Sequence, residues 1–168
     1  MTKRSYSPAE GRLLAEFTAI RWPAAQIYLR VKLGPIVRAA VSGAETPAEL
    51  AAVGIWRPWC DAVIAEGGLI TIVEAKIRPS PGMISQLEVY ARLWPATPEF
   101  EHLRSRPLRM FALMAIDVPV IRQLAAERGI VSEVYRPPWI EDYLATLHKR
   151  ASAAPQLPVP VDTQEPKR

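Results

Sequence analysis

The strongest pattern in the sequence is a pair of short apolar runs joined by two glycines. The runs at 62–65 and 69–77 are rich in Val, Ile and Thr, the residue types that favour β-strands. Between the runs, Gly67-Gly68 is typical of a two-residue hairpin turn, because both glycines tolerate a positive φ. The pattern predicts an antiparallel hairpin.

The register of this hairpin decides which side chains share a face. A two-residue turn puts Asp61 opposite Glu74, and Lys76 projects on the same face because side chains alternate along a strand. A three-residue loop, 66–68, would instead put Asp61 on the other face. Opposed carboxylates repel, so they call for a cation. Two carboxylates suit Mg²⁺ or Mn²⁺, which activates water for attack on a phosphate, and the Lys76 ammonium can stabilise the negative charge that develops there.

A helix is predicted near the beginning of the chain. Ser7-Pro8-Ala9-Glu10 is typical of a helix start, with Ser7 as the N-cap and Glu10 completing a capping box. Leu13, Leu14 and Phe17 would form its buried stripe. Glu10 points toward whatever that stripe packs on. A capping role for Glu10 is favoured over a role as a third carboxylate of the site.

Strict alternation over 26–33 predicts a half-exposed strand. One face would hold Ile27, Leu29, Val31 and Leu33, and the other Gln26, Tyr28, Arg30 and Lys32. The basic side chains Arg30 and Lys32 either follow a DNA backbone or form a solvated basic face. Arg57 and Arg78, which flank the hairpin, are the other candidates for DNA contacts.

Two tryptophans, Trp56 and Trp59, flank Arg57-Pro58 at the entry to the first hairpin strand. Exposed tryptophans beside an arginine can stack on nucleic-acid bases. Packing at the edge of the sheet is the favoured interpretation, because large aromatic side chains usually contribute to the core.

A second helix should begin at Ser80-Pro81 and end at Pro95. Gln86 and Tyr90 are four residues apart and share one side of it. In one interpretation Gln86 holds a metal ligand or a DNA phosphate and Tyr90 hydrogen-bonds within the site. In the other, Tyr90 belongs to the core and Gln86 is an exposed polar residue.

The rest of the chain completes an alternating pattern. A buried strand at 108–116, a helix that Asp117 caps and that ends at Gly129, and a strand at 130–135 favour a parallel crossover. Another short helix is predicted at 46–49, a polar loop at 96–107 and a final helix at 139–150. The Pro-rich tail, 151–168, is expected to be disordered unless a larger protein assembly orders it.

Composition narrows the class of protein. The 168 residues are 49% apolar, enough for one domain spanning 1–150, and contain no long apolar span or signal peptide. We therefore expect a soluble cytoplasmic protein with no membrane partner. Cys60 is the only cysteine, which excludes an internal disulfide and a cysteine-rich zinc site. The net charge of +4 is compatible with DNA as a partner and equally with ordinary solubility.

This order of elements resembles the PD-(D/E)XK nuclease superfamily. The residues that carry the resemblance are Asp61, Glu74-Ala75-Lys76 and the pair Gln86 and Tyr90, which looks like the Q-x-x-x-Y motif of the RecB and phage-exonuclease branch. The family's Pro-Asp pair appears here as Pro58-Trp59-Cys60-Asp61. The resemblance covers roughly 7–135. It implies an α/β fold with a restriction-endonuclease-like core: a central mixed sheet of four to five strands flanked by helices, in the order αβββαβαβ, plus a C-terminal helix.

The resemblance also implies a site and a function. Asp61, Glu74 and the main-chain carbonyl of Ala75 would hold Mg²⁺ or Mn²⁺, Lys76 would orient the attacking water, and Glu10 matches a first-helix glutamate of some members. The implied function is a metal-dependent deoxyribonuclease in DNA repair, recombination or phage DNA processing, in a bacterial or phage-infected cytoplasm. The alternative is a nuclease fold that binds DNA or serves as a structural part of a viral particle, without catalysis.

Overall fold

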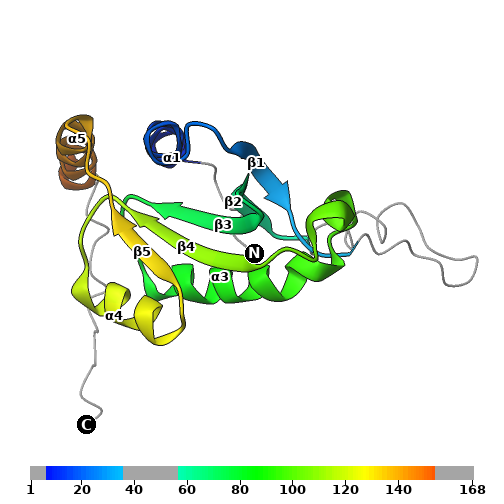
Figure 1. Cartoon of the computed structure of the whole chain (residues 1–168). Helices are drawn as coiled ribbons and strands as arrows, with labels where there is room; N and C mark the ends of the chain where they lie inside the picture. The colour runs from blue at the N-terminus through cyan, green and yellow to red at the C-terminus, as the bar shows by residue number, and fades with distance from the viewer. Residues whose placement is uncertain (1–6, 36–56, 154–168) are drawn as a thin grey trace, which may run out of the picture. The chain divides into compact units, whose positions relative to one another are not determined.

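The structure is a computed structural model, and it describes residues 7–35 and 57–153. Its elements follow the predicted order αβββαβαβ, with a further C-terminal helix and two short 3₁₀ helices, η1 and η2, after α3 (Figure 1). In chain order they are α1 (Pro8–Arg21), β1 (Gln26–Lys32), β2 (Trp59–Glu66), β3 (Leu69–Lys76), α3 (Pro81–Leu93), η1 (Trp94–Ala96), η2 (Pro98–Leu103), β4 (Leu108–Met114), α4 (Pro119–Glu127), β5 (Val131–Val134) and α5 (Trp139–Ala153).

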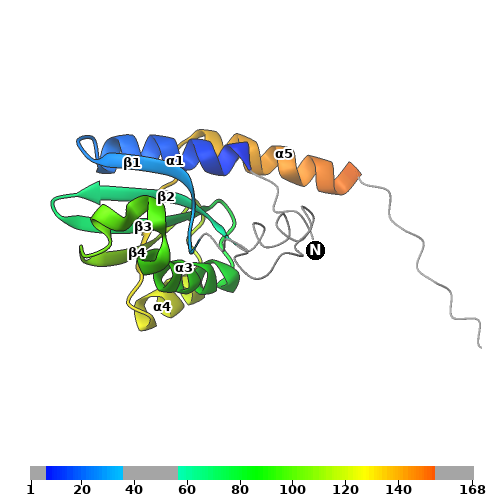
Figure 2. The ribbon, with the colours of Figure 1, turned by 90° about the vertical axis from the view of Figure 1, so that its right-hand side faces the viewer.

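The five strands form one mixed sheet in the spatial order β1-β2-β3-β4-β5. The pairs β1/β2 and β2/β3 are antiparallel, whereas β3/β4 and β4/β5 are parallel. Helix α1 lies over one face of the sheet, and α3 and α4 lie over the other (Figures 1 and 2). The predicted α/β architecture, a central mixed sheet flanked by helices, is confirmed.

The Gly67-Gly68 turn has the predicted two-residue form. Both glycines have a positive φ, 57° and 81°, and Glu66 pairs directly with Leu69. From that pair the ladder continues without a slip to Ala62 and Val73. The register that places Asp61 beside Glu74 is therefore present.

The two faces of the sheet are covered by different kinds of packing. On the α3 face, an aliphatic cluster joins Ile70 and Ile72 of β3 to Met83 and Leu87 of α3, all of them buried. On the α1 face the packing is aromatic, and its ring centroids lie 5.2–5.8 Å apart; the rings are those of Phe17, Trp22, Phe111 and Tyr135. Because β3 is covered on both faces, its six interior residues are all buried.

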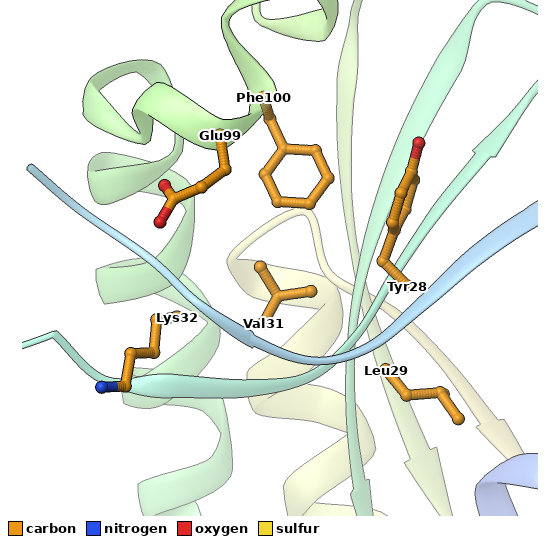
Figure 3. Close-up of a pocket in the computed structure, with 6 residues that line it drawn as sticks. All are labelled: Tyr28, Leu29, Val31, Lys32, Glu99 and Phe100. Carbon is orange, nitrogen blue, oxygen red and sulfur yellow. The ribbon is translucent and has the colours of Figure 1, made fainter.

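Strand β1 departs from the predicted alternation at Arg30. This residue has a φ of 51°, in the left-handed region that non-glycine residues rarely adopt. As a result Tyr28 and Val31 lie on the same side of the strand, facing Phe100, whereas Leu29 and Lys32 extend from the other side (Figure 3). Together with Glu99, these five side chains line a pocket of about 370 Å³. The strict two-face pattern predicted for 26–33 is therefore wrong.

Several predictions concern other parts of the chain. The predicted polar loop at 96–107 instead contains η2, whose Phe100 and Leu103 are buried. The short helix at 46–49, Trp56 and residues 154–168 lie outside the described residues. The chain divides into two compact units, Met1–Pro137 and Pro138–Arg168, of which the second contains α5. Among the helices of the described ranges, none has the length and apolar character needed to cross a membrane.

Candidate active site

The candidate site is built around the side chain of Lys76, the last residue of β3. Its Nζ atom lies 2.8 Å from Glu74 Oε1, 3.1 Å from the main-chain oxygen of Ala75, 3.5 Å from Glu10 Oε2 and 4.0 Å from Asp61 Oδ2. Four oxygen atoms from three separate elements thus converge on one ammonium group. The Lys76 side chain is only 19% exposed, so this convergence takes place largely out of water.

Glu74 is the most buried member of the cluster. Its side chain has no exposed surface, and the charge of Lys76 lies directly beside it. An ionised carboxylate removed from water is costly unless a positive charge and hydrogen bonds accompany it. The position two residues before Lys76 provides that partner, because alternate residues of a strand project to the same side.

Asp61 enters the cluster at the point where the β2/β3 ladder ends. The last ladder pair is Ala62 with Val73, and beyond it the Ala75 N–H donates to Asp61 Oδ2 at 2.9 Å. A main-chain donor of β3 therefore holds the carboxylate in place. The side chain of Asp61 remains 29% exposed, so this carboxylate faces solvent more than Glu74 does.

Glu10 reaches the cluster from α1. Ser7 caps this helix as predicted, since its Oγ accepts a hydrogen bond from the Glu10 N–H at 3.4 Å. The carboxylate of Glu10 is directed to Lys76, because positions 10, 13, 14 and 17 share the face that packs on the sheet. The sequence favoured a capping role for Glu10. The contact with Lys76 instead supports the interpretation of Glu10 as a third carboxylate beside the site.

Cys60 lies directly before Asp61 and is fully enclosed. Its Sγ lies 2.9 Å from the carbonyl oxygen of Ala62, to which the thiol can donate. Burial raises the pKa of this thiol well above its ordinary value, and the negative charges of Glu74 and Asp61 raise it further. Cys60 is therefore a neutral packing group next to Asp61.

Helix α3 contributes Tyr90 and Gln86. Tyr90 belongs to the core, as one of the two interpretations predicted, and its hydroxyl donates to the main-chain oxygen of Trp59 at 2.7 Å. That bond ties α3 to the strand that carries Asp61. Gln86 is half-buried, and its Oε1 atom is buried without a hydrogen-bond partner in the part of the chain that the structure describes.

The four basic residues predicted to contact DNA have different surroundings. Arg57 makes a two-pronged ion pair with Glu99, at 2.7 Å for both contacts, and also donates to the Lys32 carbonyl at 3.0 Å. These hydrogen bonds lower the pKa of Glu99. Arg78 is exposed two residues beyond Lys76. A DNA-binding role stays a prediction for all four.

Arg30 and Lys32 both approach the ring of Trp59. The Arg30 guanidinium carbon lies 5.3 Å and the Lys32 Nζ 5.0 Å from the ring centroid. Trp59 leaves 44% of its surface exposed, which differs from the favoured interpretation of packing at the sheet edge. The sequence contains no signal for this arrangement, because it depends on the unusual backbone of Arg30.

The donor set fits a hard divalent cation. Oxygen atoms of Asp61, Glu74 and the Ala75 carbonyl lie together around the ammonium of Lys76, and oxygen atoms are the ligands that a hard cation such as Mg²⁺ prefers. Within the described ranges, no three His, Cys, Asp or Glu side chains are grouped closely enough to hold a metal by themselves. Mg²⁺ usually takes only one or two carboxylates and keeps several waters.

Comparisons with known proteins give distant matches. No protein-family model and no curated protein matches the chain. Among solved structures, a repair endonuclease from Pyrococcus abyssi matches with a TM-score of 0.47 at 14% identity, and an EndoMS complex with double-stranded DNA with 0.45 at 13%. Each match covers 82% of this chain and 50% of the other, so the chain spans about half the length of both. At these values the likeness carries no functional argument.

Proposed function

We propose that this protein is a metal-dependent deoxyribonuclease that hydrolyses phosphodiester bonds of DNA. The observation that supports the proposal is the convergence of Asp61, Glu74, Glu10 and the Ala75 carbonyl on the ammonium of Lys76. Three carboxylates beside one ammonium leave a formal charge of minus two. Such an arrangement is unfavourable for stability alone, and unbalanced buried charge is typical of functional sites.

Each residue of the cluster has a defined part in this proposal. Asp61, Glu74 and the Ala75 carbonyl would hold Mg²⁺ or Mn²⁺, which when bound supplies positive charge against the phosphate and activates a water. The Ala75 N–H fixes the Asp61 carboxylate, so that ligand is oriented before substrate arrives. Lys76 donates hydrogen bonds to the attacking water or to a phosphate oxygen, where negative charge develops.

Two contacts outside the carboxylate cluster hold the elements that carry its residues. Tyr90 holds the Trp59 carbonyl and thereby the start of β2, two residues from Asp61. The aromatic packing around Phe17 holds α1 and thereby Glu10. We therefore treat Tyr90 as a positioning residue and Glu10 as a further acidic group that holds the Lys76 side chain in place.

The test is a cleavage assay on two DNA forms, a closed circular plasmid and a linear duplex. We expect cleavage with Mg²⁺ or Mn²⁺ and none with EDTA. Asp61→Asn and Lys76→Ala should each lower the rate by at least about 100-fold, as does the removal of a group that stabilises transition-state charge. Glu99→Gln is the matched control, because it neutralises a carboxylate that also contacts a basic side chain, and it should cleave normally.

The two DNA forms separate the modes of cleavage. Cutting of the circle indicates an endonuclease, and digestion of the linear form alone indicates an exonuclease. Circular dichroism must show that the variants are folded. An unchanged rate in both Asp61→Asn and Lys76→Ala would refute the assignment, as would the absence of cleavage of either DNA by the parent protein.

A further inference from the structure

Trp59, whose side chain is exposed, belongs to the same strand as Asp61 of the carboxylate cluster. Trp59 and Asp61 are two residues apart on β2, with the buried Cys60 between them. Two residues of a strand span about 7 Å, so the main chain of Trp59 lies close to that of Asp61. The main-chain oxygen of Trp59 is fixed by Tyr90, so the ring projects from an anchored point.

Two cationic side chains accompany this ring. Lys32 is the residue of β1 paired with Trp59, and Arg30 approaches the same ring from two residues earlier. Both are exposed, and the left-handed backbone of Arg30 lies across from Asp61 in the β1/β2 register. A residue other than glycine holds this backbone conformation only where the surrounding structure imposes it.

The charge of the carboxylate cluster makes such cations necessary for a DNA substrate. Three carboxylates and one ammonium repel a phosphate backbone, and Arg57 is already engaged by Glu99. Arg30 and Lys32 place positive charge close to the cluster, where a neighbouring phosphate would pass. An exposed contact between a cation and an aromatic ring is weaker than base stacking on the same ring, so DNA can displace the cations toward its phosphates.

We infer that Trp59, together with Arg30 and Lys32, binds an unpaired nucleotide beside the phosphodiester that the carboxylate cluster cleaves. Trp59 stacks on the base, while Arg30 and Lys32 contact the adjacent phosphates. The face of a base inside a duplex is covered by its neighbours, so the ring can stack only on an unpaired or terminal base. The inference rests on the proposed function and specifies its substrate as DNA with a single-stranded segment at the cleavage point.

The test measures binding in EDTA, where no cleavage takes place. The probe is a fluorescently labelled single-stranded oligonucleotide, with a relaxed, covalently closed duplex circle as unlabelled competitor. Trp59→Ala should weaken binding of the single strand by about 10-fold or more and leave competition by the circle within about twofold. Trp59→Phe should retain most of the affinity, because phenylalanine still presents a ring face.

Variants of the neighbouring residues separate stacking from charge. Leu29→Ala is the control, because Leu29 is 57% exposed on the side of β1 from which Lys32 extends and has no ring (Figure 3). It should bind both DNAs normally. Lys32→Ala should weaken the binding of both DNAs and reduce the salt dependence of binding by about one phosphate contact. Arg30→Gly should do the same while keeping the fold, because glycine adopts the positive φ without strain.

Two results would overturn the inference. One is single-strand binding that is absent in the parent protein or unchanged in Trp59→Ala, and the other is an equal loss for the single strand and the circle. Failure of the proposed function is a separate result, because the nuclease proposal is tested by cleavage in Mg²⁺ and the present inference by binding in EDTA. A protein that binds single strands through Trp59 and cleaves nothing would refute the nuclease proposal and leave the stacking site in place.

Discussion

Two charged clusters in this protein differ in how their charges balance. At Arg57 and Glu99, one guanidinium meets one carboxylate through two hydrogen bonds of 2.7 Å, and the Glu99 side chain is 46% exposed. At Lys76, one ammonium meets three carboxylates, of which Glu74 has no exposed surface. The first cluster is neutral and partly solvated, whereas the second is acidic and largely buried.

The difference indicates what each cluster is for. A balanced pair at the surface connects the segment just before β2 to η2 and contributes modestly to stability. Excess negative charge in a buried position is costly for stability, and a divalent cation bound there would lower that cost. We therefore regard the Arg57 and Glu99 pair as a structural ion pair and the Lys76 cluster as the candidate active site.

The largest expected effect follows from removal of the only ammonium in the acidic cluster. Lys76→Met leaves the Glu74 carboxylate buried without its cation, so the free energy of unfolding should fall by about 3–5 kcal/mol. Urea unfolding in EDTA at pH 7 measures it. Glu74→Gln combined with Lys76→Met should recover much of the loss. A loss below about 1 kcal/mol in the single variant would mean that Glu74 does not depend on Lys76.

A divalent cation should stabilise the acidic cluster and leave the balanced pair unaffected. At a Mg²⁺ or Mn²⁺ concentration of about 100 times the dissociation constant, the free energy of unfolding should rise by about 2.7 kcal/mol. Differential scanning calorimetry would show this as a higher Tm that EDTA reverses. Asp61→Asn should lose the response and Glu99→Gln should keep it. The same response in Asp61→Asn would place the cation elsewhere.

Neutralising the balanced pair should have a small effect. Glu99→Gln keeps an acceptor for Arg57 but removes the charge, and the pair is partly solvated, so we expect a loss of less than about 1 kcal/mol in the free energy of unfolding. Thermal and urea unfolding at pH 7 provide the measurement. A loss as large as that of Lys76→Met would contradict the distinction between the two clusters.

The smallest expected effect is the loss, at acidic pH, of the contribution that Glu99 makes to the free energy of unfolding. Hydrogen bonds from Arg57 lower the pKa of Glu99 in the folded protein, so the folded state releases this proton more readily than the unfolded state. The resulting stabilisation is present above the ordinary glutamate pKa, about 4.3, and is lost as the pH falls through the lower folded value. After screening it amounts to a few tenths of a kcal/mol. The stability difference between the parent protein and Glu99→Gln should therefore shrink below pH 4.3, and a growing difference would show the opposite sign.

Much of the site follows from local rules that the sequence obeys. Gly67 and Gly68 specify a two-residue turn because few other residues adopt positive φ twice in succession, and that turn fixes the partner of every residue in the hairpin. Alternation then places Glu74 and Lys76 on one side. The proximity of Asp61, Glu74 and Lys76 could therefore be predicted without the structure. The roles assigned to them stay predictions.

Other features were decided by tertiary structure. Glu10 reaches Lys76 because α1 packs through Phe17 and Trp22 onto β4, and capping propensity contains no information about that packing. The pairing of Arg57 with Glu99 joins residues 42 positions apart. Trp59 is 44% exposed with Arg30 and Lys32 over its ring, and the left-handed backbone of Arg30 has no signal in a residue type that normally avoids it. The sequence by itself determined the hairpin and its acidic pair, because turn chemistry and strand alternation act over a few residues. Only the tertiary structure decided which distant side chains surround that pair, because those contacts depend on how whole helices and strands pack.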